Sequence, residues 1–124
     1  MAPLILIIED NPLNTKLVRD ILQSQGYETR EAATATQGLE MVRRERPDLI
    51  LMDIELPGMD GLQATRVLKE DPATRDIPVL AVTAYAMKGD AEKALAAGCD
   101  GYISKPIQLK DFIDRVKAFL GEKS

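Results

Sequence analysis

Four short runs of apolar residues divide the chain, and each is followed by polar or turn-forming residues. The runs span Leu4–Ile8, Leu49–Met52, Val79–Val82 and, more weakly, Gly101–Ser104. Their apolar residues are consecutive instead of alternating with polar ones, which is typical of strands buried on both faces of a sheet. A fifth segment, Tyr27–Glu31, alternates and carries charge, so we expect a strand at or near a sheet edge.

Stretches with helical spacing lie between and after these runs. The positions that mark five predicted helices recur three and four residues apart. They are Leu13, Leu17, Val18, Ile21 and Leu22; Leu39 and Val42; Leu62, Thr65 and Leu68; Ala91, Ala94 and Leu95; and Leu109, Phe112, Ile113, Val116, Phe119 and Leu120. Gly26 is placed to end the first helix, and Thr34 with Gln37 forms a capping-box pattern before the second. Strand and helix thus alternate five times, which predicts parallel crossovers and a doubly wound α/β sheet covered by helices on both faces.

Composition limits the chemistry of which the chain is capable. It has 124 residues, enough for one domain with its own core, and it carries a net charge of −4 with a pI near 4.9. Its longest basic run is Arg43-Arg44, so it lacks the cluster of Lys and Arg that binds a nucleic-acid backbone. With no His and a single Cys99, His-based catalysis, Cys/His zinc sites and an internal disulfide are excluded.

Nothing in the sequence indicates a membrane partner. The longest apolar run, Leu4–Ile8, is far shorter than the roughly 20 residues that cross a bilayer, and no signal peptide is recognisable. We therefore expect a cytoplasmic protein that binds neither membranes nor nucleic acid. Five strand–helix units account for residues 1–124, so we also expect a single domain with no output domain attached.

Chemically active side chains follow the predicted strands. Glu9 and Asp10 come after the first strand, Asp53 after the third, Thr83 after the fourth and Lys105 after the fifth. Ligands of open parallel sheets bind beyond the carboxyl ends of the strands, so these side chains are predicted to converge at one edge. Taken singly, each has an ordinary structural explanation. Asp10 could cap the first helix, Thr83 suits a strand, and Lys105 could be a surface cation.

Taken together, the same side chains indicate phosphoryl chemistry. Carboxylates crowded at one place repel one another unless a cation neutralises them, and Mg²⁺ prefers oxygen ligands, commonly one or two carboxylates with a phosphate oxygen. Positioning and charge neutralisation do most of the catalysis in phosphoryl transfer, and an Asp can act as the nucleophile by forming an aspartyl phosphate. Thr83 and Lys105 would then bind the equatorial oxygens of the transferred group.

In their sequence context, these residues resemble the receiver domain of the two-component response regulators, the family of CheY. The resemblance covers the whole chain and is carried by four motifs, namely Glu9-Asp10, Asp53 with Leu56–Gly61, Thr83-Ala84, and Tyr102–Pro106. It implies a flavodoxin-like α/β fold, with five parallel strands in the order 2-1-3-4-5 and five helices. A narrower resemblance, to stand-alone cell-cycle regulators of this family, is carried by Glu9–Asn11, Leu13-Asn14 and residues 81–90.

The resemblance also implies a metal and a phosphoacceptor. Asp53 would receive the phosphoryl group. Asp10 and Asp53 would bind Mg²⁺, or Mn²⁺ in its place, directly. Glu9 would bind the metal through a water molecule, and the main-chain carbonyl of Glu55 would be the last of the metal ligands that the protein supplies.

Further roles that the resemblance implies concern catalysis, switching and partners. Lys105 would pair with the phosphoryl group, Thr83 would hydrogen-bond to it and move inward, and Tyr102 would swing from an exposed to a buried position. A histidine kinase or a histidine phosphotransfer protein would donate the phosphoryl group, and downstream target proteins would read the change. The protein would then not be an enzyme, except in promoting its own phosphorylation and dephosphorylation.

Four other interpretations remain open. The chain could be a receiver domain of a hybrid histidine kinase, or a receiver-like domain that is never phosphorylated. A phosphatase of the haloacid-dehalogenase type also uses an Asp nucleophile, but it has a second Asp two residues later, where this chain has Glu55. An FMN-binding flavodoxin would need a loop rich in Gly and hydroxyls after the first strand, where Glu9–Pro12 would repel phosphate.

Overall fold

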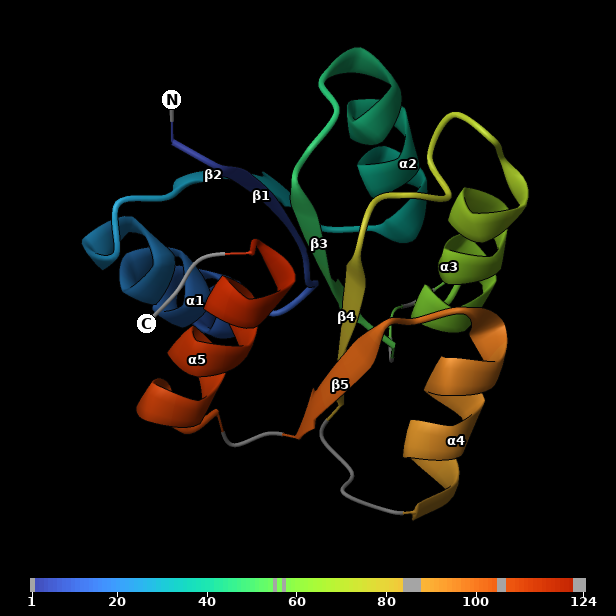
Figure 1. The fold of residues 1–124 in the computed structure, drawn as a ribbon. Coiled ribbons are helices and arrows are strands. Elements are labelled where there is room, and N and C mark those ends of the chain that lie inside the picture. The colour runs from blue at the N-terminus through green and yellow to red at the C-terminus, as the bar shows by residue number, and fades with distance from the viewer. Residues whose placement is uncertain (1, 55, 57, 84–87, 105–106, 122–124) are drawn as a thin grey trace.

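The computed structural model describes residues 2–54, 56, 58–83, 88–104 and 107–121. Strands and helices alternate through this part of the chain, as predicted (Figure 1). In chain order they are β1 (Leu4–Ile8), α1 (Pro12–Ser24), β2 (Glu28–Ala32), α2 (Ala35–Arg44), β3 (Leu49–Asp53), α3 (Gly61–Glu70), β4 (Val79–Thr83), α4 (Lys88–Ala97), β5 (Gly101–Ser104) and α5 (Leu109–Phe119). No helix in the described ranges is both long enough and apolar enough to cross a membrane.

The five strands form one parallel sheet in the order β2-β1-β3-β4-β5. This confirms the doubly wound α/β fold and the strand order that the resemblance implied. The three central strands are buried along their whole length, whereas β2 is mostly exposed and lies at an edge. β2 begins one residue later than predicted, because Tyr27 is buried before the strand and its pairing with β1 starts at Glu28.

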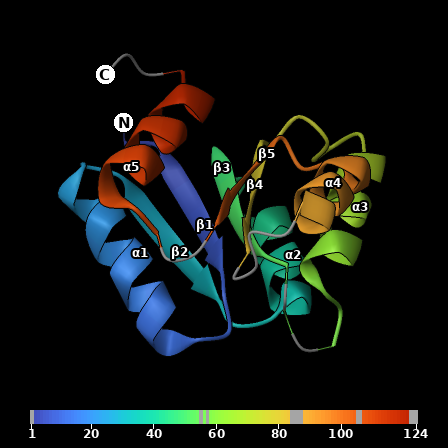
Figure 2. The same cartoon turned by 90° about the horizontal axis from the view of Figure 1, so that it is seen from below.

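Helices cover both faces of the sheet, with α1 and α5 on one face and α2, α3 and α4 on the other (Figures 1 and 2). Alternate residues of β1 contribute to the two layers. Leu6 and Ile8 belong to the core beneath α2, α3 and α4, and Ile5 and Ile7 belong to the core beneath α1 and α5. Consecutive apolar residues in β1 are therefore explained by burial on both sides, as the sequence predicted.

Part of the predicted apolar face of α1 is exposed. Val18 and Leu22 are buried, but Leu13 is 77% exposed and Leu17 is 49% exposed. At about 100° per residue, Leu13 and Leu17 lie about 100° or more around the helix from Val18 and Leu22, beyond the side that contacts the sheet. The prediction was also wrong for Leu95 of α4, which is half-exposed.

Gly61 brings the start of α3 close to the end of β3. A Cβ atom at this position would lie less than 3.0 Å from the Asp53 carbonyl oxygen and 2.7 Å from the Ile54 Cα, and both neighbours are backbone atoms. Only a residue without a side chain allows this approach. Gly61 therefore helps to fix the backbone at Asp53.

We expect Gly61→Ala to lower the free energy of unfolding by about 1–3 kcal/mol, the usual cost of overpacking, because neither backbone segment can easily move. Gly38→Ala in α2 is the comparison, since its Cβ would meet side-chain atoms of the buried Ile8 and no backbone atom. Urea unfolding of both variants measures the difference. A Gly61→Ala protein as stable as the wild type would show that this close approach is unnecessary.

Candidate functional site

Glu9 and Asp10 lie directly after β1, where the chain turns into α1. The Glu9 amide donates to the Ala32 carbonyl at 3.0 Å, and the Glu9 side chain is buried. The N-cap of α1 is Asn11, whose Oδ1 accepts a hydrogen bond from the Leu13 amide at 2.9 Å. The capping role that offered a structural explanation for Asp10 thus belongs to Asn11, and the exposed Asp10 carboxylate does not cap the helix.

Asp53 and Thr83 end two neighbouring strands. Asp53 is the last residue of β3, which lies at the centre of the sheet, and only 4% of it is exposed. It lies opposite Val82 of β4, and Thr83 follows one position further along, opposite Ser104 of β5 and equally buried. Both side chains are therefore carried by rigid, fully covered strands at the carboxyl edge of the sheet.

The fold brings three predicted carboxylates together. Glu9, Asp10 and Asp53 each offer an oxygen atom, and these three oxygens lie within 4.8 Å of one another. Oxygens on opposite sides of a Mg²⁺ ion are about 4 Å apart, because each Mg–O bond is about 2.1 Å long. The spacing and the all-oxygen donor set therefore fit Mg²⁺ bound directly or through water.

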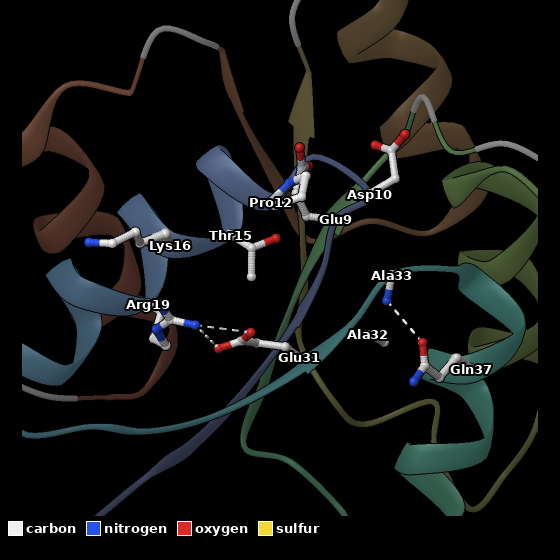
Figure 3. Close-up of a pocket in the computed structure, with 10 residues that line it drawn as sticks. All are labelled: Glu9, Asp10, Pro12, Thr15, Lys16, Arg19, Glu31, Ala32, Ala33 and Gln37. Carbon is white, nitrogen blue, oxygen red and sulfur yellow. Dashed lines mark hydrogen bonds and ion pairs between the residues drawn. The ribbon is translucent and has the colours of Figure 1, made fainter.

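A hollow beside these acids separates α1 from β2 and the start of α2 (Figure 3). Glu9 and Asp10 lie at one end of it, and an ion pair between Arg19 and Glu31 lies at the other, with 2.9 Å between the Arg19 Nη1 and the Glu31 Oε2. The hydrogen bond that Arg19 donates to Glu31 raises the pKa of Arg19 above its usual value. Since Glu31 is neutralised by Arg19, it adds no free negative charge to the three clustered acids.

Of the other three predicted site residues, the structure describes only Tyr102. Tyr102 lies on β5 and is 36% exposed, with its carbonyl accepting a hydrogen bond from the Arg115 Nη1 at 2.6 Å. Its predicted movement on activation stays a prediction. Glu55 and Lys105 lie outside the described residues.

Asn14 is a site neighbour to which the sequence assigned no role. Its Nδ2 donates a hydrogen bond to the Glu9 Oε1 at 3.0 Å. The spacing of five residues between them could have suggested the contact, because a residue in the first turn of a helix faces the end of the strand before it. Whether the Asn14 side chain bonds to Glu9 or to the backbone at the helix start depends on the conformation of the turn between β1 and α1.

Cys99 has a structural role. It is buried in the core beneath α2, α3 and α4, where its Sγ lies 3.5 Å from the Thr65 Oγ1. Burial raises the pKa of the Cys99 thiol, which keeps it protonated and unreactive.

Comparison with known proteins agrees with this architecture. Residues 5–117 match the family described as the response regulator receiver domain. The chain belongs to this family of signalling proteins, as the four motifs indicated. The match covers most of the chain and favours the receiver over the phosphatase and the flavodoxin interpretations.

Within this family, the chain is similar to response regulators named DivK. The chain is 50% identical to the polar-differentiation response regulator DivK of Brucella anthropi over 122 residues, which cover 98% of this chain and 99% of that protein. It is 49% identical to DivK of Brucella ovis over the same shares of both chains. These matches confirm the narrower resemblance to the DivK-type regulators.

Solved structures show the same fold. A putative response regulator from Chloroflexus aurantiacus superimposes with a TM-score of 0.95 at 28% identity, covering 98% of this chain and all 100% of that one. The receiver domain of a sensor histidine kinase from Pseudomonas aeruginosa gives a TM-score of 0.91 at 35% identity, covering 98% and 100% of the two chains. That second structure holds a magnesium ion coordinated in its active site cleft.

Proposed function

We propose that this receiver domain takes up a phosphoryl group on Asp53. The observation that carries the proposal is the cluster of three carboxylates, in which Asp53 alone is on a central strand and deeply buried. Its own Oδ atom would attack phosphorus, forming a P–O bond as the P–N bond to a donor histidine breaks. The departing imidazole nitrogen keeps the electron pair and takes up a proton, and Asp53 becomes an aspartyl phosphate.

The proposed site holds Mg²⁺ through the Asp10 and Asp53 carboxylates, with Glu9 acting through water. When bound, the ion neutralises negative charge that gathers between the phosphoryl oxygens and the acids. Mn²⁺ has similar ligand preferences and would serve in its place. Glu55, which is proposed to add its main-chain carbonyl, lies outside the described residues.

Thr83 is proposed to donate its hydroxyl to a phosphoryl oxygen, and its place at the end of β4 beside β3 supports this role. Lys105, outside the described residues, is proposed to pair with another phosphoryl oxygen. The inward movement of Thr83 and the burial of Tyr102 would then change the surface that other proteins bind.

The phosphoryl donor is proposed to be a histidine kinase or a histidine phosphotransfer protein, because this chain contains no His of its own. The output is proposed to be binding to downstream target proteins in the cytoplasm through this receiver domain, residues 1–124. The likeness to DivK over 98% of the chain supports this interpretation.

Acetyl phosphate, a small phosphoryl donor, tests the proposed function without a kinase. After incubation with acetyl phosphate and Mg²⁺, intact-mass spectrometry is expected to show one added phosphoryl group that is lost at alkaline pH. EDTA is the control and should suppress the adduct, because the negative charges are then unneutralised. A wild-type protein that gains no such group with Mg²⁺ present would contradict the proposal.

A further inference from the structure

Asn14 contacts the acidic site from the first turn of α1. It is half-buried, and its Nδ2 donates to the Oε1 of the buried Glu9 at 3.0 Å. Glu9, Asn14 and Asp53 also share the lining of a small cavity of about 20 Å³. A cavity of this size has room for about one water molecule.

The hydrogen-bond partner of Asn14 differs from the partners of the two glutamines at the same helical position. Asn14, Gln37 and Gln63 each occupy the third position of their helices. The Gln63 Oε1 accepts a hydrogen bond from the Asp60 amide at 3.2 Å, and the Gln37 Oε1 accepts one from the Ala33 amide at 3.0 Å. Both glutamines therefore use their side-chain oxygen to accept a hydrogen bond from a backbone amide at the helix start.

Asn14 instead uses its amide nitrogen, and its acceptor is a carboxylate of the cluster. A neutral donor adds no positive charge, so the cluster keeps its full attraction for a cation. The hydrogen bond nevertheless fixes one oxygen of a side chain that has three rotatable bonds, and it thereby restricts where the other oxygen lies.

We propose that Asn14 is a positioning residue, which holds the Glu9 carboxylate in the arrangement that favours Mg²⁺ over larger divalent cations. The inference rests on the proposed metal site and deepens it. Mg²⁺ requires near-octahedral ligands at about 2.1 Å, whereas Ca²⁺ accepts six to eight ligands at about 2.3–2.6 Å in flexible arrangements. Glu9 is proposed to act through a water ligand, so a loosened Glu9 that no longer holds this water in place costs Mg²⁺ more affinity than it costs Ca²⁺.

The test compares Kd values for Mg²⁺ and Ca²⁺, measured by titration calorimetry, in the wild type, Asn14→Leu and Asn14→Ala. We expect both variants to weaken Mg²⁺ binding by about tenfold, the lower end of the range for residues that orient metal ligands, and to weaken Ca²⁺ binding less. Gln63→Leu is the matched control, because it removes an amide from the same helical position without touching the acids. It should leave both Kd values unchanged.

A double-mutant cycle shows whether Asn14 acts through Glu9. In a Glu9→Gln background, Asn14→Leu should no longer change the Mg²⁺ affinity. Unchanged Mg²⁺ binding by the Asn14 variants, or equal losses for Mg²⁺ and Ca²⁺, would overturn this inference alone. A wild-type protein that binds no Mg²⁺ would overturn the proposed metal site and this inference with it.

Discussion

Asp53→Asn is expected to abolish the adduct that acetyl phosphate forms with the wild-type protein. The substitution keeps the shape of the side chain but replaces the anionic oxygen with a neutral amide that cannot attack phosphorus. Asp53 is 4% exposed at the end of a central strand, so no other carboxylate can move into its place without rearranging β3. Intact-mass spectrometry under the conditions used for the wild type measures the loss.

Asp60→Asn is the matched control for this prediction. Asp60 is a nearby carboxylate that caps α3, with its Oδ1 accepting from the Gln63 amide at 2.8 Å. Asn caps helices as well as Asp does, so the fold should be retained. The control should form the adduct at the wild-type level, whereas an adduct that persists in Asp53→Asn would place the acceptor elsewhere.

Asp10→Ala is expected to weaken Mg²⁺ binding by roughly 100-fold or more. Removal of a residue that only orients a metal ligand costs about 10–100-fold, and Asp10 is proposed to be a ligand itself. Titration calorimetry measures the Kd. Thermal unfolding gives a second measurement, because Mg²⁺ should raise the melting temperature of the wild type through preferential binding to the folded state, and should raise that of the variant much less.

Glu31→Ala separates a ligand role from a general effect of negative charge. Glu31 lines the same hollow as Asp10, but its charge is paired with Arg19 and it lies outside the cluster of three acids. Its removal should leave Mg²⁺ affinity close to the wild-type value. Equal losses in Asp10→Ala and Glu31→Ala would mean that the ion responds to overall charge and has no defined carboxylate ligands.

The centre of the sheet was predictable because its strands are buried on both faces. In β1, β3 and β4 every residue is buried. Burial requires mostly apolar residues there, so the apolar runs in the sequence predicted these three strands. The convergence of Glu9, Asp10 and Asp53 followed from the same information, since parallel strands place their carboxyl ends at one edge. Sequence position along buried strands was therefore enough to locate the acidic cluster.

Features that depend on local conformation were not predictable in this way. The spacing of Leu13 and Leu17 fits an apolar helix face. The rotation of α1 about its own axis, however, places these two side chains away from the sheet, where they are exposed. The sequence offered Asp10 as a cap for α1, but the backbone places Asn11 there. The link between Asn14 and Glu9 arises from that same turn.

Borohydride reduction identifies the phosphorylated residue directly, because it converts an aspartyl phosphate to homoserine and so marks the residue that carried the phosphoryl group. The protein, incubated with acetyl phosphate and Mg²⁺, is reduced and digested, and its peptides are sequenced by mass spectrometry. We expect homoserine at position 53. A reduced carboxyl group at Glu9, Asp10 or Asp60 with Asp53 unmodified would contradict it.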